Sequence, residues 1–271
     1  MKCKIFEVIN LQTKLRVLVE DRNFNSALES EHGLSIFVDN GSSKFIFDCG
    51  HTGLAWKNAI KLGVDLTAIN FVVISHSHYD HAGGFPKLLD YVTPKILYTG
   101  VDFWEEKFSR ADSEFIYKGA GFTSKDLSRW NIQQKICHDI LKLDDKIFLV
   151  GNFARHTEFE NIPEKFVRGN NKLPDNFSDE ICMVIRENDG LNVIAGCSHV
   201  GIVNIVSTIA ERFNEKIIRL IGGVHLLNAD DERLDKTLTA LKNFGVKDFK
   251  LCHCSGEKIC GNISTGDEIL I

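Results

Sequence analysis

The feature that most constrains this chain is the segment His-Ser-His-Tyr-Asp-His, which runs from His76 to His81. It follows residues 70–75, a short apolar run that is typical of a buried strand. Imidazole nitrogens and carboxylate oxygens are the ligands that zinc and related divalent ions prefer. Side chains two apart in an extended segment point the same way, so His76 and His78 face one position, and a turn brings Asp80 and His81 to a second. This crowding directly after a buried strand favours a metal-binding site over a polar surface loop.

The apolar pattern along the chain predicts strands that alternate with helices, with hairpins in both halves. Asn40-Gly41 is typical of a hairpin turn, because both residues tolerate positive φ. The predicted strands are residues 15–19, 34–38, 44–48, 70–75, 146–150, 181–186, 191–195, 217–221, 249–251 and 268–271. The predicted helices are residues 54–62, a segment that starts near Pro86, 203–213 and 232–244. This order predicts an α/β fold of two sheets with helices outside them.

Residues from about 100 to 135 do not follow that alternation and are rich in aromatic and charged side chains. Two interpretations stay open from the sequence. The segment either packs over the metal site, where its rings would contact a substrate, or forms an ordinary surface subdomain.

Composition limits the classes of partner. The chain has 271 residues, a formal net charge of -5 and no dense block of lysine and arginine, so a nucleic-acid partner has no electrostatic support. No stretch approaches the ~20 apolar residues that span a bilayer, and the N-terminus does not resemble a signal peptide. We therefore expect a cytoplasmic protein with a small-molecule substrate and no membrane or nucleic-acid partner. The eight cysteines, Cys3 among them, are expected to be reduced thiols.

The histidine segment, extended to His-Ser-His-Tyr-Asp-His-Ala-Gly-Gly, resembles the HxHxDH signature of the metallo-β-lactamase superfamily. Phe47-Asp48-Cys49-Gly50 stands where such proteins carry an Asp-x-Gly strand end. The resemblance covers essentially the whole chain. It implies one domain over residues 1–271 with the four-layer αββα sandwich of that superfamily, and metals at one edge between the two sheets.

Further segments resemble one subgroup of the superfamily, which is often called dihydropteroate-synthase-like. These segments are Glu31-His32-Gly33-Leu34-Ser35, Gly196-Cys197-Ser198-His199-Val200-Gly201-Ile202, Gly222-Gly223-Val224-His225-Leu226 and His253-Cys254-Ser255-Gly256. The subgroup includes an archaeal enzyme that joins a pterin pyrophosphate to a ribosyl-aminobenzene phosphate. It also includes bacterial members described only as metal-dependent hydrolases.

The resemblance implies a set of metal ligands. His76 and His78 match the first metal site, Asp80 and His81 match the second, and His253 matches the final histidine ligand. One departure concerns the strand at 191–195, which leads to Cys197 where the superfamily has a bridging aspartate. We expect His199, two residues on, to complete the first site. Cys197 is either a thiolate ligand or a buried neighbour, and the missing carboxylate makes a second ion less secure.

Other polar residues are candidates for substrate contact or support. His32 and His225 are predicted either to act in the pocket as substrate contacts or acid–base groups, or to bond neighbouring loops. Asp48 is expected to orient a ligand rather than to bind metal. Cys254 is either a thiol near the site or a small core residue. His51, His138 and His156 are expected to be surface or packing residues.

The leading functional hypothesis is hydrolysis of a small ester, phosphoester or lactone by a metal-activated hydroxide, with Asp80 orienting the nucleophile. The alternative is a transferase that condenses a pterin pyrophosphate with an aminobenzene-type acceptor. A third hypothesis, a metal or redox sensor using Cys197, Cys252 and Cys254, lacks the four spaced cysteines that iron–sulfur clusters use. One or two divalent ions are expected, zinc first, although iron, manganese and nickel suit the same ligands. The sequence does not indicate an oligomeric state.

Overall fold

The computed structural model describes residues 12–261 and 263–271, so Cys3 lies outside the described residues. Seven strands form the first sheet, in the order β17-β1-β2-β3-β4-β5-β8. Their bounds are β1 Lys14–Val19, β2 Ser35–Asp39, β3 Lys44–Phe47, β4 Phe71–Val73, β5 Ile96–Thr99, β8 Gln133–Ile136 and β17 Glu268–Leu270. β3, β4, β5 and β8 run parallel to one another, so their carboxyl ends meet at one edge of the sheet.

The second sheet has six strands in the order β16-β15-β14-β13-β10-β9. Their bounds are β9 Ile140–Lys142, β10 Ile147–Val150, β13 Cys182–Glu187, β14 Gly190–Ala195, β15 Ile217–Gly222 and β16 Asp248–Leu251. β14, β15 and β16 are parallel, and their carboxyl ends lead into the segments that carry Cys197, His225 and His253.

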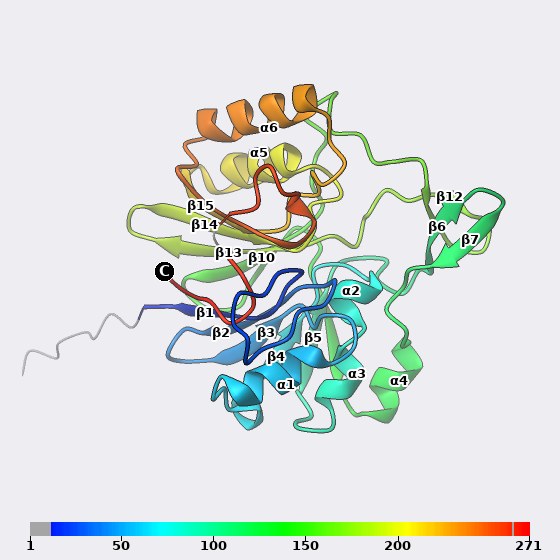
Figure 1. The fold of residues 1–271 in the computed structure, drawn as a ribbon, viewed down its shortest axis with the longest axis vertical. Coiled ribbons are helices and arrows are strands. Elements are labelled where there is room, and N and C mark those ends of the chain that lie inside the picture. The colour runs from blue at the N-terminus through cyan, green and yellow to red at the C-terminus, as the bar shows by residue number, and fades with distance from the viewer. Residues whose placement is uncertain (1–11, 262) are drawn as a thin grey trace, which may run out of the picture.

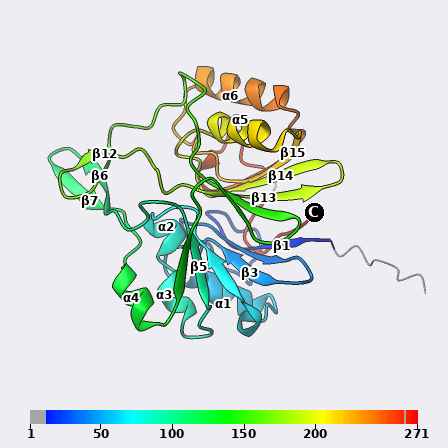
Figure 2. The same ribbon diagram turned by 180° about the vertical axis from the view of Figure 1, so that it is seen from behind.

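Helices cover the outer face of each sheet, which gives four layers (Figures 1 and 2). α5 (Ile202–Phe213) and α6 (Asp231–Asn243) cover the second sheet, and α1 (Leu54–Lys61), α3 (Phe85–Leu88) and α4 (Ser124–Arg129) lie against the first. A short helix, α2 (Tyr79–Ala82), carries part of the histidine segment. Short 3-10 helices span Leu66–Ala68 and His253–Ser255.

Three clusters of buried apolar side chains fill the spaces between these layers. The central cluster joins the facing sides of the two sheets and includes Val17, Phe47, Val73, Leu149 and Ile194. The second lies between the six-stranded sheet and the helix pair α5 and α6, and the third lies between the seven-stranded sheet and α1 with α3. The αββα sandwich that the sequence predicts is therefore the observed fold.

A third, four-stranded sheet was not predicted. Its order is β12-β11-β6-β7, with bounds β6 Lys107–Ala111, β7 Glu114–Tyr117, β11 Phe166–Arg168 and β12 Leu173–Pro174. It projects from one side of the sandwich as an arm (Figure 1). All four residues of β7 are exposed, so the strand lacks the alternation of buried and exposed positions by which a sequence reveals a strand.

The described cysteines, from Cys49 to Cys260, are all free thiols. Within residues 12–261 and 263–271, no helix is long and apolar enough to cross a membrane.

Candidate metal centre

The histidine segment lies at the carboxyl edge of the first sheet, directly after β4. His76 and His78 precede α2, and Asp80 and His81 lie within its first turn. Gly33 fixes how closely this turn approaches β2, since a Cβ atom there would lie 2.6 Å from the backbone oxygen of Asp80. The same oxygen accepts a hydrogen bond from the Leu34 amide at 3.1 Å.

The first candidate group consists of His76, His78 and His199, whose ligand atoms lie within 4.8 Å of one another. All three side chains are buried. The Nε2 atoms of all three, and also Nδ1 of His199, have no hydrogen-bond partner among the described residues. Buried polar atoms are normally satisfied, so converging orphan nitrogens fit an absent cation.

Burial keeps these rings neutral. It lowers the pKa of His76 and of His199 well below the usual value, and it lowers the pKa of His78 to about 3. A neutral imidazole presents a free lone pair, which is the form that binds a metal. The Phe177 ring stacks on His199 with centroids 4.1 Å apart and closes one side of the group.

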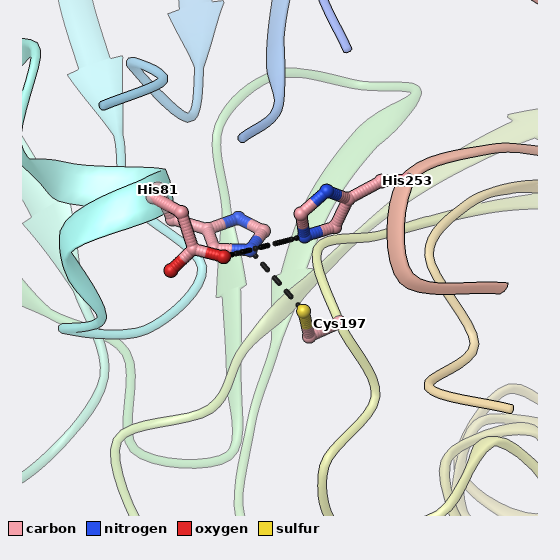
Figure 3. A group of neighbouring side chains, drawn as sticks. His81, Cys197 and His253 are labelled. Carbon is pink, nitrogen blue, oxygen red and sulfur yellow. Dashed lines mark hydrogen bonds and ion pairs between the residues drawn. The ribbon is translucent and has the colours of Figure 1, made fainter. Parts of the chain in front are cut away.

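The second candidate group consists of Asp80, His81, Cys197 and His253. Figure 3 shows His81 and His253 pointing toward each other with the Cys197 sulfur beneath them. Nε2 of His81 lies 3.2 Å from Sγ of Cys197 and 3.2 Å from Nε2 of His253. Oδ2 of Asp80 lies 3.5 Å from Nε2 of His253. Burial alone would raise the pKa of Asp80, but the neighbouring histidines outweigh it and hold this pKa well below its usual range.

Asp48 supports the second group from behind. Its Oδ2 lies 2.7 Å from Nδ1 of His81, and it also accepts hydrogen bonds from the Ser75 amide at 2.7 Å and hydroxyl at 2.8 Å. Asp48 therefore orients His81 and does not face the ligand atoms of the group.

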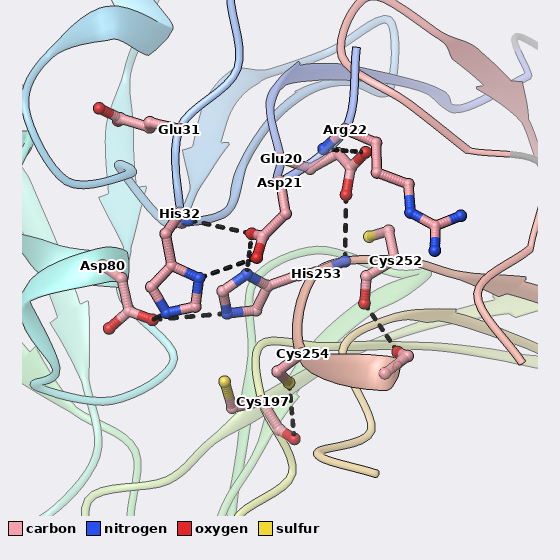
Figure 4. Close-up of polar contacts among 12 residues, drawn as sticks. Glu20, Asp21, Arg22, Glu31, His32, Asp80, Cys197, Cys252, His253 and Cys254 are labelled. Carbon is pink, nitrogen blue, oxygen red and sulfur yellow. Dashed lines mark hydrogen bonds and ion pairs between the residues drawn. The ribbon is translucent and has the colours of Figure 1, made fainter. Parts of the chain in front are cut away.

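Asp21 supports the same group from the other side, as Figure 4 shows. One of its oxygens lies 2.6 Å from Nδ1 of His253 and the other lies 2.8 Å from Nδ1 of His32. Nε2 of His32 in turn lies 3.3 Å from Asp80. Hydrogen bonds to Asp21 and Asp80 raise the pKa of His32 to about 9. Asp21 thus holds one candidate ligand and one candidate catalytic group in fixed positions.

His225 and Cys254 follow β15 and β16 and lie beside both groups. The His225 ring is 4.2 Å from that of His199, and its buried Nδ1 has no hydrogen-bond partner among the described residues. The Cys254 thiol accepts a hydrogen bond from the His225 amide at 3.3 Å. Cys254, Cys197 and His225 form a further set with ligand atoms within 4.8 Å.

A cavity of about 500 Å³ opens over both groups. Its lining includes the sequence-predicted residues His32, His78, Asp80, Cys197, His199, His225 and His253. None of the seven aromatic side chains of residues 100–135, all of which the structure describes, lines this cavity. Phe103, Phe122 and Trp130 instead pack around Phe85 in the core, so these rings are not placed to stack on a molecule in the cavity. The segment contributes Ser109 and Lys118, and the aromatic lining comes from Tyr79 and Phe166.

Comparison with known proteins agrees with this geometry. Residues 30–153 match the family described as the metallo-beta-lactamase superfamily. The crystal structure of Tm1679, a metal-dependent hydrolase of the beta-lactamase superfamily, is similar with a TM-score of 0.81 and 32% identity, over 96% of this chain and 99% of that one. This chain belongs to the metallo-β-lactamase superfamily. Membership implies divalent metal binding and supports an enzyme of the metal-dependent hydrolase type.

Two more proteins are similar to this chain. The 7,8-dihydropterin-6-methyl-4-(β-D-ribofuranosyl)-aminobenzene-5'-phosphate synthase of Methanocaldococcus jannaschii is 31% identical over 261 residues, which cover 90% of this chain and 88% of that protein. Human tRNase Z, short form, shares the fold with a TM-score of 0.55 at 14% identity, over 94% of this chain and 98% of that one.

Several residues that support the candidate site were not predicted from the sequence. Asp21 lies two residues after the end of β1, and its place after a predicted strand was the one available signal. Glu180 accepts hydrogen bonds from the His199 and Val200 amides at 2.8 Å each, and Asp179 accepts one from the Ser77 amide at 2.8 Å. These two carboxylates precede β13, but no pattern in the sequence pairs them with loops so distant along the chain.

Proposed function

We propose that this protein is a metal-dependent hydrolase that acts on a small ester, phosphoester or lactone in the cavity above the two ligand groups. The observation that carries the proposal is the convergence of unpartnered, buried ring nitrogens from His76, His78 and His199, of which His78 and His199 line that cavity. A cavity of about 500 Å³ is of the size that takes a small molecule, which supports that class of partner over a nucleic acid or a membrane.

The residues present fit one or two divalent ions. His76, His78 and His199 would hold the first, and Asp80, His81, Cys197 and His253 would hold the second. Nitrogen, carboxylate and thiolate ligands in such numbers suit zinc, which we propose as the resident ion. When bound, a divalent ion supplies Lewis acidity and lowers the pKa of water from 15.7 to ~7.

The chain's own residues have separate roles in this proposal. Asp80 holds the attacking oxygen in line, because its Oδ2 lies at the cavity wall between His32 and His253. His32 reaches the same carboxylate and moves a proton at its Nε2 atom. His225 lines the cavity beside His199, where we propose that its ring contacts the leaving group.

The test combines metal content with turnover. The zinc-loaded protein should hydrolyse p-nitrophenyl acetate, bis(p-nitrophenyl) phosphate or a homoserine lactone. The double variant His76→Ala with His78→Ala should lose bound zinc and lose that activity. His138→Ala is the matched control, because His138 is exposed and does not line the cavity. If the double variant keeps both zinc and turnover, the proposal is abandoned.

A transferase that condenses a pterin pyrophosphate with an aminobenzene-type acceptor is the second candidate. It is supported by 31% identity over most of the chain to an aminobenzene-5'-phosphate synthase. The purified protein would be incubated with hydroxymethyl-dihydropterin pyrophosphate and an aminobenzene acceptor. Release of pyrophosphate that depends on the acceptor would support the transferase, and no release with any acceptor would count against it.

A further inference from the structure

Two thiols lie together in the lining of the cavity, and the proposed hydrolysis uses one of them. Sγ of Cys197 and Sγ of Cys254 lie within 4.8 Å of each other. Cys197 belongs to the second ligand group, whereas Cys254 has no role in that reaction. Figure 4 shows the two side chains beside each other below His253, where the Cys254 thiol donates a hydrogen bond to the Cys197 backbone oxygen at 3.6 Å.

The fold brings these thiols together across a strand that separates them. Cys197 follows β14 and Cys254 follows β16, and β15 lies between those two strands. Strands two apart in a sheet are ~10 Å from each other, so the segments that follow them must converge for the sulfurs to meet. Gly223, just after β15, permits this, because a Cβ atom there would lie 2.8 Å from Sγ of Cys254 and 2.2 Å from the Gly196 backbone oxygen.

Neighbouring groups hold both sulfurs in place. Sγ of Cys254 accepts a hydrogen bond from the His225 amide at 3.3 Å, and Sγ of Cys197 lies 3.2 Å from Nε2 of His81. In a disulfide the sulfurs are ~2.05 Å apart. Closing the gap between Cys197 and Cys254 therefore takes a movement of under ~3 Å in total.

The same two thiols are the ones that a small molecule in the cavity can reach. Cys197 and Cys254 line the cavity, and the other described cysteines do not; these are Cys49, Cys137, Cys182, Cys252 and Cys260. Redox-active cysteines are accessible thiols that stand next to a second, resolving thiol. Among the described cysteines, this pair combines both properties at the cavity.

We infer that Cys197 and Cys254 form a reversible disulfide when the protein meets a hydroperoxide, and that this bond removes Cys197 from the second ligand group. The inference rests on the proposed function, since it concerns regulation of the same site. A metal is bound by the thiolate form of cysteine, and a sulfur in a disulfide no longer has that form. Oxidation should therefore weaken zinc binding at the second group, whereas the first group contains no cysteine and should keep its ion.

The reaction balances with hydrogen peroxide as the oxidant. Sγ of Cys254 attacks one peroxide oxygen, the O–O bond breaks and hydroxide leaves, which gives a sulfenic acid on Cys254. Sγ of Cys197 then attacks that sulfur, the S–S bond forms, the S–O bond breaks and a second hydroxide leaves. The two hydroxides take up the two thiol protons, so the products are one disulfide and two waters. A dithiol reductant returns the two electrons and restores both thiols.

The test follows thiols and zinc, and it does not depend on turnover. The zinc-loaded protein would be treated with hydrogen peroxide, alkylated and digested without reduction. Mass spectrometry should then find the Cys197 peptide linked to the Cys254 peptide. A chromophoric chelator should detect zinc released from the second group in step with that linkage, and dithiothreitol with added zinc should reverse both changes. Absence of the linkage, or linkage without zinc release, would overturn the inference.

Cys254→Ser separates disulfide formation from general oxidation, because it leaves Cys197 in place. This variant should load zinc as wild type does, and it should keep that zinc at the peroxide concentration that empties the second group of wild type. Cys260→Ser is the matched control, since Cys260 is half-buried and lies outside the cavity, and it should form the linkage and lose zinc as wild type does.

Two results with these variants would contradict the inference. Equal zinc release from Cys254→Ser and wild type would show that peroxide oxidises Cys197 directly. Failure of both Cys254→Ser and Cys254→Ala to load zinc would make Cys254 a metal ligand. Failure of the proposed function is a different result, namely retention of zinc and turnover by the reduced His76 and His78 double variant. A protein with zinc-dependent esterase activity and no linkage after peroxide would refute the inference alone.

Discussion

Nδ1 of His81 lies 2.7 Å from Oδ2 of Asp48, and both side chains are fully buried. A carboxylate on one ring nitrogen fixes the orientation of the ring and increases the basicity of the other nitrogen. That other nitrogen, Nε2, is the one that faces Cys197 and His253. The second ligand group therefore depends on a residue at the end of β3 that does not belong to the group.

Asp48→Asn tests this dependence. Asn tolerates the positive φ of 59° at this position, so the change removes charge and leaves the backbone as it is. Loss of the carboxylate should lower zinc affinity at the second group by about 10- to 100-fold. Competition with a chromophoric chelator measures this, and the His76, His78 and His199 group should keep its ion. Equal loss of both ions, or of neither, would show that Asp48 does not act on His81.

Gly196→Ala should disrupt the contact between Asp48 and His81 by a steric clash. A Cβ atom at Gly196 would lie 2.1 Å from Oγ of Ser75 and 2.9 Å from Oδ2 of Asp48. Because both atoms are buried, we expect a loss of on the order of 2–3 kcal/mol in the free energy of unfolding together with lower zinc content. Gly63→Ala is the control, since its Cβ meets nothing within 4 Å and its φ of +72° costs only about 1 kcal/mol. That variant should keep its zinc. A normal zinc content in Gly196→Ala would contradict the prediction.

Lys107 anchors the arm to the sandwich through a buried ion network. Its Nζ lies 2.9 Å from Asp175 and 2.9 Å from Asp179. Lys107→Met leaves two buried carboxylates without their cation and should lower the free energy of unfolding by about 3–5 kcal/mol. Lys146→Met breaks a more exposed pair and should cost about 1 kcal/mol or less. Urea unfolding of both variants measures the difference, and equal costs would contradict the prediction.

Glu160 gives a pH dependence away from the ligand groups. Its carboxylate accepts hydrogen bonds from the Val203 and Asn204 amides at 2.9 Å each, at the start of α5. Burial raises the pKa of Glu160 above its ordinary value of 4.5, and these hydrogen bonds only partly oppose it. The folded state then holds the proton more tightly than the unfolded state. The contribution of Glu160 to the free energy of unfolding is therefore fully present below pH 4.5, and it is lost as the pH rises through the pKa of the folded state.

The stability difference between wild type and Glu160→Gln should therefore shrink as pH rises through that window and stay constant above it. Urea unfolding at several values from about pH 4 to pH 7 measures the difference. Ala210→Gly, a change on α5 that adds no titrating group, should be destabilised by about 1 kcal/mol at every pH. If the stability difference between wild type and Glu160→Gln instead grew with pH, the pKa of Glu160 would be lowered by folding and not raised, which would contradict the prediction.

The sandwich could be predicted because its strands are apolar and its turns carry local signals. β4 and β14 are buried runs, and the turn at Asn40-Gly41 joins β2 to β3 as expected. The histidine segment was readable for the same reason, since four candidate ligands stand together after one such run. A local sequence pattern is sufficient to predict a structural element when the contacts that form it are also local in sequence.

The residues that hold the candidate ligands in place could not be predicted from local sequence patterns. Asp21 contacts His253, which lies 232 residues later in the sequence. Lys107 contacts Asp179, which lies 72 residues later. Both are ordinary polar residues in sequence, and only the closure of the fold gives them their partners. The arm was missed because β7 is exposed on both faces, so no burial pattern marks it.

The pairing of β1 with β17, in which Leu15 lies opposite Ile269, has a consequence for the protein during its synthesis. β1 has no neighbour on that side until residues 268–270 have been synthesised. Asp21, shortly after β1, likewise has no contact with His253 until that residue has been synthesised. The histidine segment emerges much earlier, so a nascent chain carries strong metal ligands for most of translation before it can form the finished site. The complete second ligand group, with Asp21 behind His253, can therefore form only after both ends of this long separation have been synthesised.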